Sequence, residues 1–183
     1  HGTPFAGRMK IYAGNYNDMM DAAVIIITAG ANQKEGETRL DLVKKNKKIF
    51  EEIIPEISNR DYEGILLIVS NPVDILTYTA IKISGFEENR VIGSGTVLDS
   101  ARFRYLLGKH LDVDSRSVQA FIIGEHGDSE IAAWSSVNVS GIPVNDFCEM
   151  RGHYDHEEAM KAIADNVKES AYKIIKRKKA TYY

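Results

Sequence analysis

The stretch Val24-Ile25-Ile26-Ile27-Thr28-Ala29-Gly30 indicates the fold class of this chain. It is a run of β-branched residues that ends at a small residue and a glycine, which is typical of a buried strand. Two further runs have the same character: Ile65-Leu66-Leu67-Ile68-Val69, which stops at Ser70-Asn71-Pro72, and Val91-Ile92, which leads into Gly93-Ser94-Gly95. Because these runs do not alternate apolar and polar residues, they predict parallel strands in a sheet that is covered on both faces.

The segments between the strand candidates have the periodicity of helices. From residue 40 to residue 54, apolar residues recur on one helical face; they are Leu42, Val43, Ile49, Phe50, Ile53 and Ile54. Residues 74–84 connect the next pair of strands, and residues 9–12 are a further short strand candidate. This order predicts an α/β fold with a partial doubly wound, Rossmann-type parallel sheet, in which ligands bind at the carboxyl ends of the strands.

After Gly95 the pattern changes to that of an α+β domain. We expect four elements there: a helix over residues 97–110, a strand over 118–124, turn-broken strands over 134–144 and a long amphipathic helix over 156–177. The predicted domains are the C-terminal part of an NAD-binding Rossmann-type domain over residues 1–97 and a catalytic, substrate-binding domain over residues 98–183.

Two observations concern the ends of the chain. None of the 14 glycines completes the Gly-x-Gly-x-x-Gly loop that receives a dinucleotide pyrophosphate. The predicted sheet also lacks the strands with which such a domain begins, and the sequence stops directly after a helix. We therefore expect the natural chain to be longer at both ends.

Composition argues against several function classes. The formal net charge of -3 gives no reason to expect nucleic acid or an anionic membrane as a partner. The longest apolar runs are far shorter than the roughly 20 residues that span a bilayer. A single cysteine, Cys148, excludes an internal disulfide framework and fits a reducing compartment. With no basic and apolar leader ahead of His1, we expect a cytoplasmic protein.

His126 lies in Gly124-Glu125-His126-Gly127-Asp128, directly after an apolar run. An imidazole between two glycines at a strand end is either a loop residue without a role or an acid–base group. The second interpretation requires a carboxylate that fixes the tautomer and stabilises the imidazolium. Glu125 and Asp128 are too close in the sequence to reach the ring comfortably, so the partner should come from another segment.

Asp99 is the candidate partner. It stands at the start of a helical segment, where it could simply cap the helix, and Arg102 follows three positions later on the same helix face. The two residues are therefore either an intrahelical ion pair or a catalytic device. In the device, Asp99 orients a base and Arg102 binds a substrate carboxylate through two parallel hydrogen bonds. The residues by themselves leave both interpretations open.

The polar segment of residues 30–39 leaves a strand end and precedes a helix. It is either a solvated connection with Thr38 as a helix cap, or a lid that brings Arg39 to a ligand on closing. In the same way, Asn71-Pro72 is either a turn or a means of holding an amide in the ligand crevice.

Five segments, in order and in register, resemble the L-lactate dehydrogenase family, including its bacterial members. They are ITAGANQ at residues 27–33, GETRL at 36–40, SNPVDIL at 70–76, GSGTVLDSAR at 93–102 and GEHGDS at 124–129. The resemblance covers essentially the whole chain. It implies an NAD-dependent oxidoreductase of glycolysis and pyruvate fermentation, which interconverts pyruvate and L-lactate by hydride transfer in a cytoplasmic homotetramer.

The resemblance also implies residue roles. His126 exchanges a proton with the 2-oxygen of the substrate, Asp99 holds the ring in its charged form, and Arg39 polarises the substrate carbonyl. Arg102 binds the substrate carboxylate and Asn71 lies near the reacting oxygen, while Gln33 and Thr181 line the substrate pocket. The positions that match the cofactor site are Gly30, Ala31, Val69, Ser70, Asn71, Ser94 and, more weakly, Tyr16.

Gln33 bears on the choice of substrate. The sister malate dehydrogenases carry an arginine at this place, which pairs with the second carboxylate of oxaloacetate. A neutral glutamine leaves that carboxylate desolvated and unpaired, so pyruvate is favoured over malate or another 2-hydroxy acid. A non-catalytic fragment that acts through subunit contacts is the alternative of another class. The joint presence of His126, Asp99, Arg102 and Arg39 argues against it.

A regulatory phosphate site and a metal site have weaker support in the sequence. Bacterial members of the family are often activated by fructose 1,6-bisphosphate, through an arginine and a histidine. Arg104 matches the arginine, but Gln119 stands in place of the histidine and cannot carry a positive charge, which argues against activation. His153 and His156 are more simply the solvated start of a helix than metal ligands, because no matching pair was found elsewhere in the sequence. We expect no metal.

Overall fold

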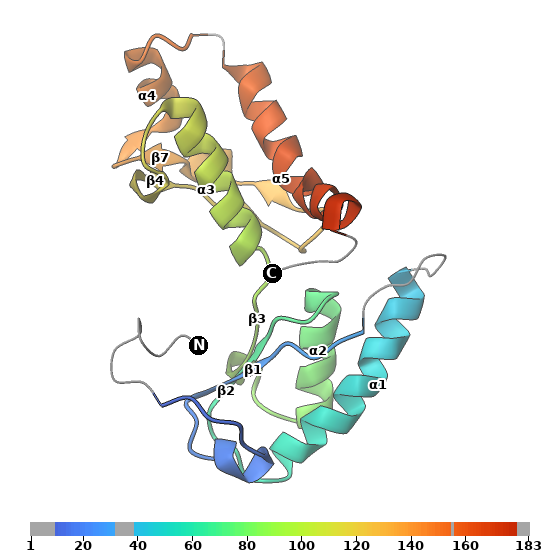
Figure 1. Ribbon diagram of the computed structural model, residues 1–183. Helices are drawn as coiled ribbons and strands as arrows, with labels where there is room; N and C mark the ends of the chain where they lie inside the picture. The colour runs from blue at the N-terminus through green and yellow to red at the C-terminus, as the bar shows by residue number, and fades with distance from the viewer. Residues whose placement is uncertain (1–9, 32–38, 155, 179–183) are drawn as a thin grey trace.

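The computed structural model describes residues 10–31, 39–154 and 156–178, except for the side chains of Arg39 and Ile175. The chain forms two lobes, which follow one another in the sequence (Figure 1). We call them the N-terminal lobe, up to Gly93, and the C-terminal lobe, from Val97. Each lobe has its own cluster of buried apolar side chains. The predicted domain boundary between residues 97 and 98 stays a prediction.

The N-terminal lobe contains a parallel sheet in the order β1-β2-β3. Its strands are β1 (Val24–Ile27), β2 (Ile65–Ile68) and β3 (Val91–Gly93). Val24 pairs with Ile65 in the first ladder, and Leu66 pairs with Val91 in the second. The crossovers are helices α1 (Arg39–Ser58) and α2 (Val73–Ser84). Short 3-10 turns lie at η1 (Tyr16–Met19) and η2 (Glu88–Arg90). The three strands and two crossover helices predicted between residues 24 and 93 are present, with small differences at their ends.

Both helices lie on the same face of the sheet (Figure 1). Successive strands are added in one direction, and right-handed crossovers then place their helices on one side. Phe50 and Ile54 of α1 pack with Leu66 of β2, and all three are fully buried. On the other face the described residues provide no such cover: Val24, Ile26 and Ile92 are 45%, 58% and 45% exposed.

Two predictions for this lobe were therefore wrong in the part of the chain that is described. The sheet is covered on one face rather than on both. The predicted strand at residues 9–12 is also absent: residues 10–12 have no regular secondary structure, while Met9 lies outside the described residues. Among the described helices, none is long and apolar enough to cross a membrane.

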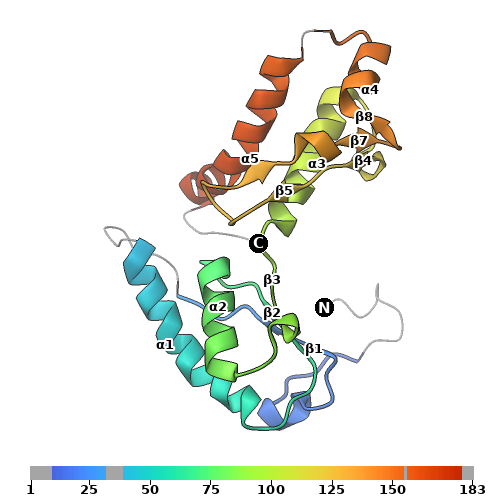
Figure 2. The ribbon, with the colours of Figure 1, turned by 180° about the vertical axis from the view of Figure 1, so that it is seen from behind.

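The C-terminal lobe combines helices with short antiparallel strands (Figure 2). The helices are α3 (Val97–Leu111), α4 (Val144–Met150) and α5 (Glu157–Lys178), with 3-10 turns η3 (Ser115–Ser117) and η4 (Trp134–Ser136). Strands β4 (Val118–Gln119), β7 (Asn138–Val139) and β8 (Ile142–Pro143) form one sheet, and β5 (Ile122–Ile123) pairs with β6 (Ile131–Ala132). The core lies between α3, α5 and these strands, with the ring of Phe103 4.9 Å from that of Trp134.

The predicted strand over residues 118–124 is two strands in the structure. Ala120 and Phe121 separate β4 from β5, because β4 pairs with β7 whereas β5 pairs with β6. The change of partner brings the chain out of one small sheet and into the other, and the loop of His126 follows β5 directly.

Candidate active site

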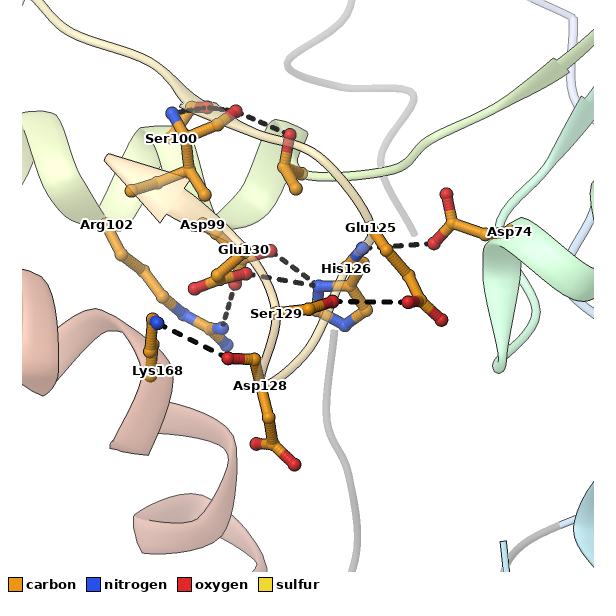
Figure 3. A network of polar contacts seen from close by, with 12 residues as sticks. Asp74, Asp99, Ser100, Arg102, Glu125, His126, Asp128, Ser129, Glu130 and Lys168 are labelled. Carbon is orange, nitrogen blue, oxygen red and sulfur yellow. Dashed lines mark hydrogen bonds and ion pairs between the residues drawn. The ribbon is translucent and has the colours of Figure 1, made fainter. Parts of the chain in front are cut away.

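The loop between β5 and β6 holds His126 in a conformation that depends on its two glycines. Gly124 and Gly127 have positive φ angles of 91° and 135°, a backbone conformation that residues other than glycine rarely adopt. The loop is tied down by Lys168 of α5, whose ammonium donates to the carbonyl of Asp128 at 3.3 Å. This fixed loop presents the imidazole toward the start of α3 (Figure 3).

Asp99 contacts that imidazole directly. Its Oδ2 lies 2.6 Å from His126 Nδ1, and Asp99 is only 2% exposed. Helix α3 begins at Val97 with Thr96 as its N-cap, so Asp99 is the third helical residue and not the cap. With Nδ1 held by a carboxylate, the free ring nitrogen Nε2 is the one that can exchange a proton with a ligand.

Arg102 binds the other oxygen of the same carboxylate. Its Nη1 lies 3.2 Å from Asp99 Oδ1, one turn along α3. The sequence left open whether Asp99 and Arg102 pair with each other or serve a site. In the structure the pair is present, and Asp99 contacts His126 at the same time (Figure 3). The guanidinium is therefore anchored next to the imidazole.

The Asp99–His126 contact stabilises the charged form of both groups. The hydrogen bond that His126 donates to Asp99 raises the pKa of His126, against the opposing effect of burial, and the charges of Asp99, Glu130 and Asp74 add to the increase. Burial alone would raise the pKa of Asp99, but the hydrogen bond and charge of His126 and the charge of Arg102 outweigh it and lower it. The pair therefore favours an imidazolium beside a carboxylate.

Glu130 is a third titratable group here, which the sequence did not reveal. It is 2% exposed, and its Oε2 lies 4.0 Å from His126 Nδ1. Burial and then the charge of Asp99 raise the pKa of its carboxyl group. Its Oε1 is buried and has no hydrogen-bond partner among the described residues. No pattern distinguishes this glutamate in the sequence, because it simply follows a polar loop.

The backbone of His126 is held from the other lobe. Its N–H donates to Oδ2 of Asp74 at 3.0 Å, and Asp74 lies in the first turn of α2 (Figure 3). The acid–base group of one lobe is thus positioned by the helix that follows β2 in the other. Asp74 lies in the segment SNPVDIL at residues 70–76, which resembles the family, but the sequence did not predict its contact with His126.

Asn46 organises the edge where β1 and β2 end. Its side chain accepts from the N–H of Ala31 at 2.7 Å and donates to the carbonyl of Asn71 at 2.7 Å. It is buried on α1. A signal for it does exist in the sequence: an asparagine interrupts the apolar face of the helix, between Val43 and Phe50.

Most of the predicted cofactor residues lie at this carboxyl edge. Ser70 donates its hydroxyl to the carbonyl of Ala29 at 2.6 Å, and the N–H of Ser94 donates to Ile68 at 2.8 Å. Val69 directly follows β2 and donates its N–H to the carbonyl of Ile27, and Gly30 lies three residues after the end of β1. Tyr16 is separate from them, because η1 precedes β1 and lies where the strands begin, with Arg60 against its ring.

Other predicted site residues fall outside what the structure describes. Gln33 and Thr181 lie beyond the described residues. Arg39 is the first residue of α1, but its side chain is not described.

Arg104, the predicted phosphate-binding residue, lies on another face of α3 from Asp99, and its guanidinium donates to the carbonyl of Ala120 at 3.3 Å.

Comparison with known proteins agrees with this arrangement. Residues 1–93 match the model of the lactate/malate dehydrogenase NAD-binding domain, and residues 96–183 match that of the lactate/malate dehydrogenase α/β C-terminal domain. The chain belongs to the lactate/malate dehydrogenase family. The predicted resemblance, and the predicted α/β fold with a Rossmann-type sheet followed by an α+β domain, are thereby confirmed.

Among members of the lactate/malate dehydrogenase family, the chain is 55% identical to the L-lactate dehydrogenase of Acetivibrio thermocellus, over 100% of this chain and 58% of that protein. A solved lactate dehydrogenase from a Medee basin deep-sea metagenome library is 49% identical, with a TM-score of 0.91. The ligand-bound minor L-lactate dehydrogenase of Enterococcus mundtii is 47% identical, with a TM-score of 0.90. Both matches cover 100% of this chain and 58% of the solved chain. The chain thus spans a little under three fifths of the length of these relatives.

Proposed function

We propose that the protein to which this chain belongs is an NAD-dependent L-lactate dehydrogenase. The observation that carries the proposal is the 2.6 Å contact between His126 Nδ1 and the buried Asp99, beside the anchored guanidinium of Arg102. The names of the similar proteins support lactate as the substrate class. Malate or another 2-hydroxy acid is the alternative, and the neutral Gln33 argues against it.

Each residue has a chemical task in the proposed reaction. Arg102 binds the carboxylate of pyruvate, which orients the 2-oxo group toward His126. The imidazolium donates its Nε2 proton to the 2-oxygen as negative charge develops there, and Asp99 stabilises the imidazolium before the transfer. Arg39 polarises the same oxygen, and Asn71 hydrogen-bonds near it. In the reverse direction, neutral His126 accepts the proton of the lactate hydroxyl.

The cofactor fits the carboxyl edge of the sheet. In doubly wound sheets dinucleotides bind where the strands end, and there Asn46 holds Ala31 and Asn71 in fixed positions. We place NAD along Gly30, Ala31, Val69, Ser70, Asn71 and Ser94, with Tyr16 less well supported because η1 lies at the other edge. When bound, the nicotinamide supplies or accepts the hydride at C2 of the substrate.

Three further parts of the proposal rest on the family resemblance and on composition. They are a homotetrameric assembly, a cytoplasmic location, and little activation by fructose 1,6-bisphosphate because Gln119 replaces a histidine. No metal takes part in the proposed reaction, and neither nucleic acid nor a membrane is a proposed partner.

The proposal is tested by following NADH absorbance during pyruvate reduction by the full-length protein. We expect His126→Asn to lower kcat roughly 10²- to 10⁴-fold, because a positioned acid contributes about that factor. Asp114→Asn is the control, because Asp114 pairs with Arg116 on the exposed surface. Wild-type protein without pyruvate reductase activity, or a fully active His126→Asn variant, would contradict the proposal.

A further inference from the structure

Three histidines from three segments gather at the far end of the C-terminal lobe. His110 lies in the last turn of α3, His153 follows α4, and His156 immediately precedes α5. The ring centroids of His110 and His153 are 5.5 Å apart, with an angle of 40° between the rings. Along α3, His110 is roughly 16 Å from Asp99 at 1.5 Å per residue. The proposed reaction uses none of these histidines.

The tautomer of His156 is set by its surroundings. Its Nδ1 lies 2.9 Å from the carbonyl oxygen of His153, and because a carbonyl can only accept, Nδ1 carries the proton. Nε2 of His156 therefore keeps its lone pair. Metal-binding histidines commonly have this arrangement, with one ring nitrogen donating to a backbone carbonyl and the other facing the ion.

His110 is partly buried. Its Nε2 is buried and has no hydrogen-bond partner among the described residues. An imidazole nitrogen that has no hydrogen-bond partner can offer its lone pair to a metal ion when the ring is neutral.

We propose that His110, His153 and His156 form a binding site for a divalent transition-metal ion of the Zn²⁺ or Ni²⁺ type. Imidazole nitrogens are favoured ligands for both ions. The sequence offered only His153 and His156, which are three residues apart. The structure adds His110 from a segment 43 residues earlier in the chain. A bound ion would connect the end of α3 to the α4–α5 connection and stabilise the C-terminal lobe.

Binding requires the three rings to move closer together. In the described part of the chain, only Asp99, His126 and Glu130 already place three potential ligand atoms within 4.8 Å of one another. His153 is exposed, so its ring can rotate toward its neighbours at little cost. The Asp99–His126–Glu130 group is therefore the competing site that an experiment has to separate from the histidine cluster.

The test is calorimetric titration of the full-length protein with ZnCl₂ and, separately, NiCl₂ at pH 7.5. The variants are His153→Ala and His156→Ala, which remove side chains outside the core, and the control is His126→Asn in the competing group. We expect wild-type protein and His126→Asn to bind with the same affinity, and each of the other two variants to bind at least tenfold more weakly. The titration does not depend on the proposed function, because it measures binding rather than turnover.

A second readout is the unfolding midpoint. The ion should raise Tm of the wild-type protein at pH 7.5 and raise it less at pH 5, because protons compete with the ion for the ring nitrogens. The proposal is overturned if wild-type protein binds neither ion, if His153→Ala and His156→Ala bind as tightly as wild type, or if binding is lost in His126→Asn instead. Circular dichroism of each variant verifies that it is folded.

Discussion

His126 and Asp74 are joined across the two lobes by a hydrogen bond from the His126 backbone N–H to Asp74 Oδ2, 3.0 Å long. The imidazole is therefore positioned twice: its ring by Asp99 of α3, and its backbone by α2 of the N-terminal lobe. The proposed cofactor binds to the lobe that carries Asp74. This bond therefore fixes the position of the imidazole relative to the nicotinamide that would supply the hydride.

Removing this bond should impair positioning without removing the acid. A hydrogen bond to a charged group is worth about 1.5–3 kcal/mol, so we expect Asp74→Ala to lower kcat/KM for pyruvate roughly tenfold to a hundredfold. Asp74→Asn keeps an acceptor oxygen and should lose less. Steady-state assays compare the two variants, and wild-type kcat/KM in Asp74→Ala would show that the bond has no positioning role.

The pH dependence of the two reaction directions should follow the raised pKa of His126. Pyruvate reduction needs the imidazolium, so it should be fully active below that pKa and decline as pH rises through it. Lactate oxidation needs the neutral ring and should show the opposite dependence. Asp99→Asn removes the main cause of the increase, so both profiles should move to lower pH.

His126 and Asp99 also make the stability of the fold depend on pH, in opposite directions. His126, whose pKa is raised on folding, stabilises the fold below its ordinary pKa, and this is lost as pH rises through the raised value. Asp99, whose pKa is lowered, stabilises the fold above its ordinary pKa, and this is lost as pH falls through the lowered value. If Asp99→Asn and wild type show the same dependence of unfolding free energy on pH, this coupling is ruled out. Glu149→Gln, at an exposed glutamate of α4, serves as the surface control.

Glu130 should behave in the opposite way from Asp99. Its folded pKa is raised by burial and by the charge of Asp99, so the folded state is destabilised as pH rises from the ordinary carboxyl pKa through the raised one. We expect Glu130→Gln to be more stable than wild type at pH 8 by about 1 kcal/mol, or about 3 °C in Tm. The gain should vanish at pH 4.

Thermal unfolding at the two pH values measures this difference. Glu149→Gln, at an exposed glutamate of α4, should leave Tm unchanged. A Glu130→Gln variant that is less stable than wild type at pH 8 would mean that the carboxylate makes a favourable contact in the folded protein.

How much the sequence predicts differs between local and tertiary features. Strands β1 to β3, the crossover helices and the start of α3 were predictable, because β-branched runs and helical periodicity are local. The break between β4 and β5 was not, because it depends on which strands pair. The Asp74 contact was missed for the same reason: 52 residues separate Asp74 from His126, and only the packing of the lobes brings them together. Glu130 is only four residues from His126, but its burial beside Asp99 and His126 depends on the tertiary fold.

The absence of a histidine at position 119 predicts a weak response to fructose 1,6-bisphosphate. We expect kcat/KM for pyruvate at neutral pH to change less than about twofold on its addition, because the neutral Gln119 adds no charge to pair with a phosphate. Arg104 already donates to the carbonyl of Ala120. Gln119→His should increase the response, and strong activation of the wild-type protein would show that other residues hold the phosphates.

Gln33 should determine whether the enzyme prefers a 2-oxo acid with one carboxylate, such as pyruvate, or one with two, such as oxaloacetate. We expect Gln33→Arg to raise the ratio of kcat/KM for oxaloacetate to that for pyruvate at least tenfold, because a guanidinium that pairs with the second carboxylate is worth about 1.5–3 kcal/mol. Asn145→Arg, which adds the same charge at an exposed position of α4, should leave the ratio unchanged. Parallel assays with both 2-oxo acids measure it. A ratio that does not move in Gln33→Arg would place substrate discrimination at another residue and reopen the assignment of lactate over malate.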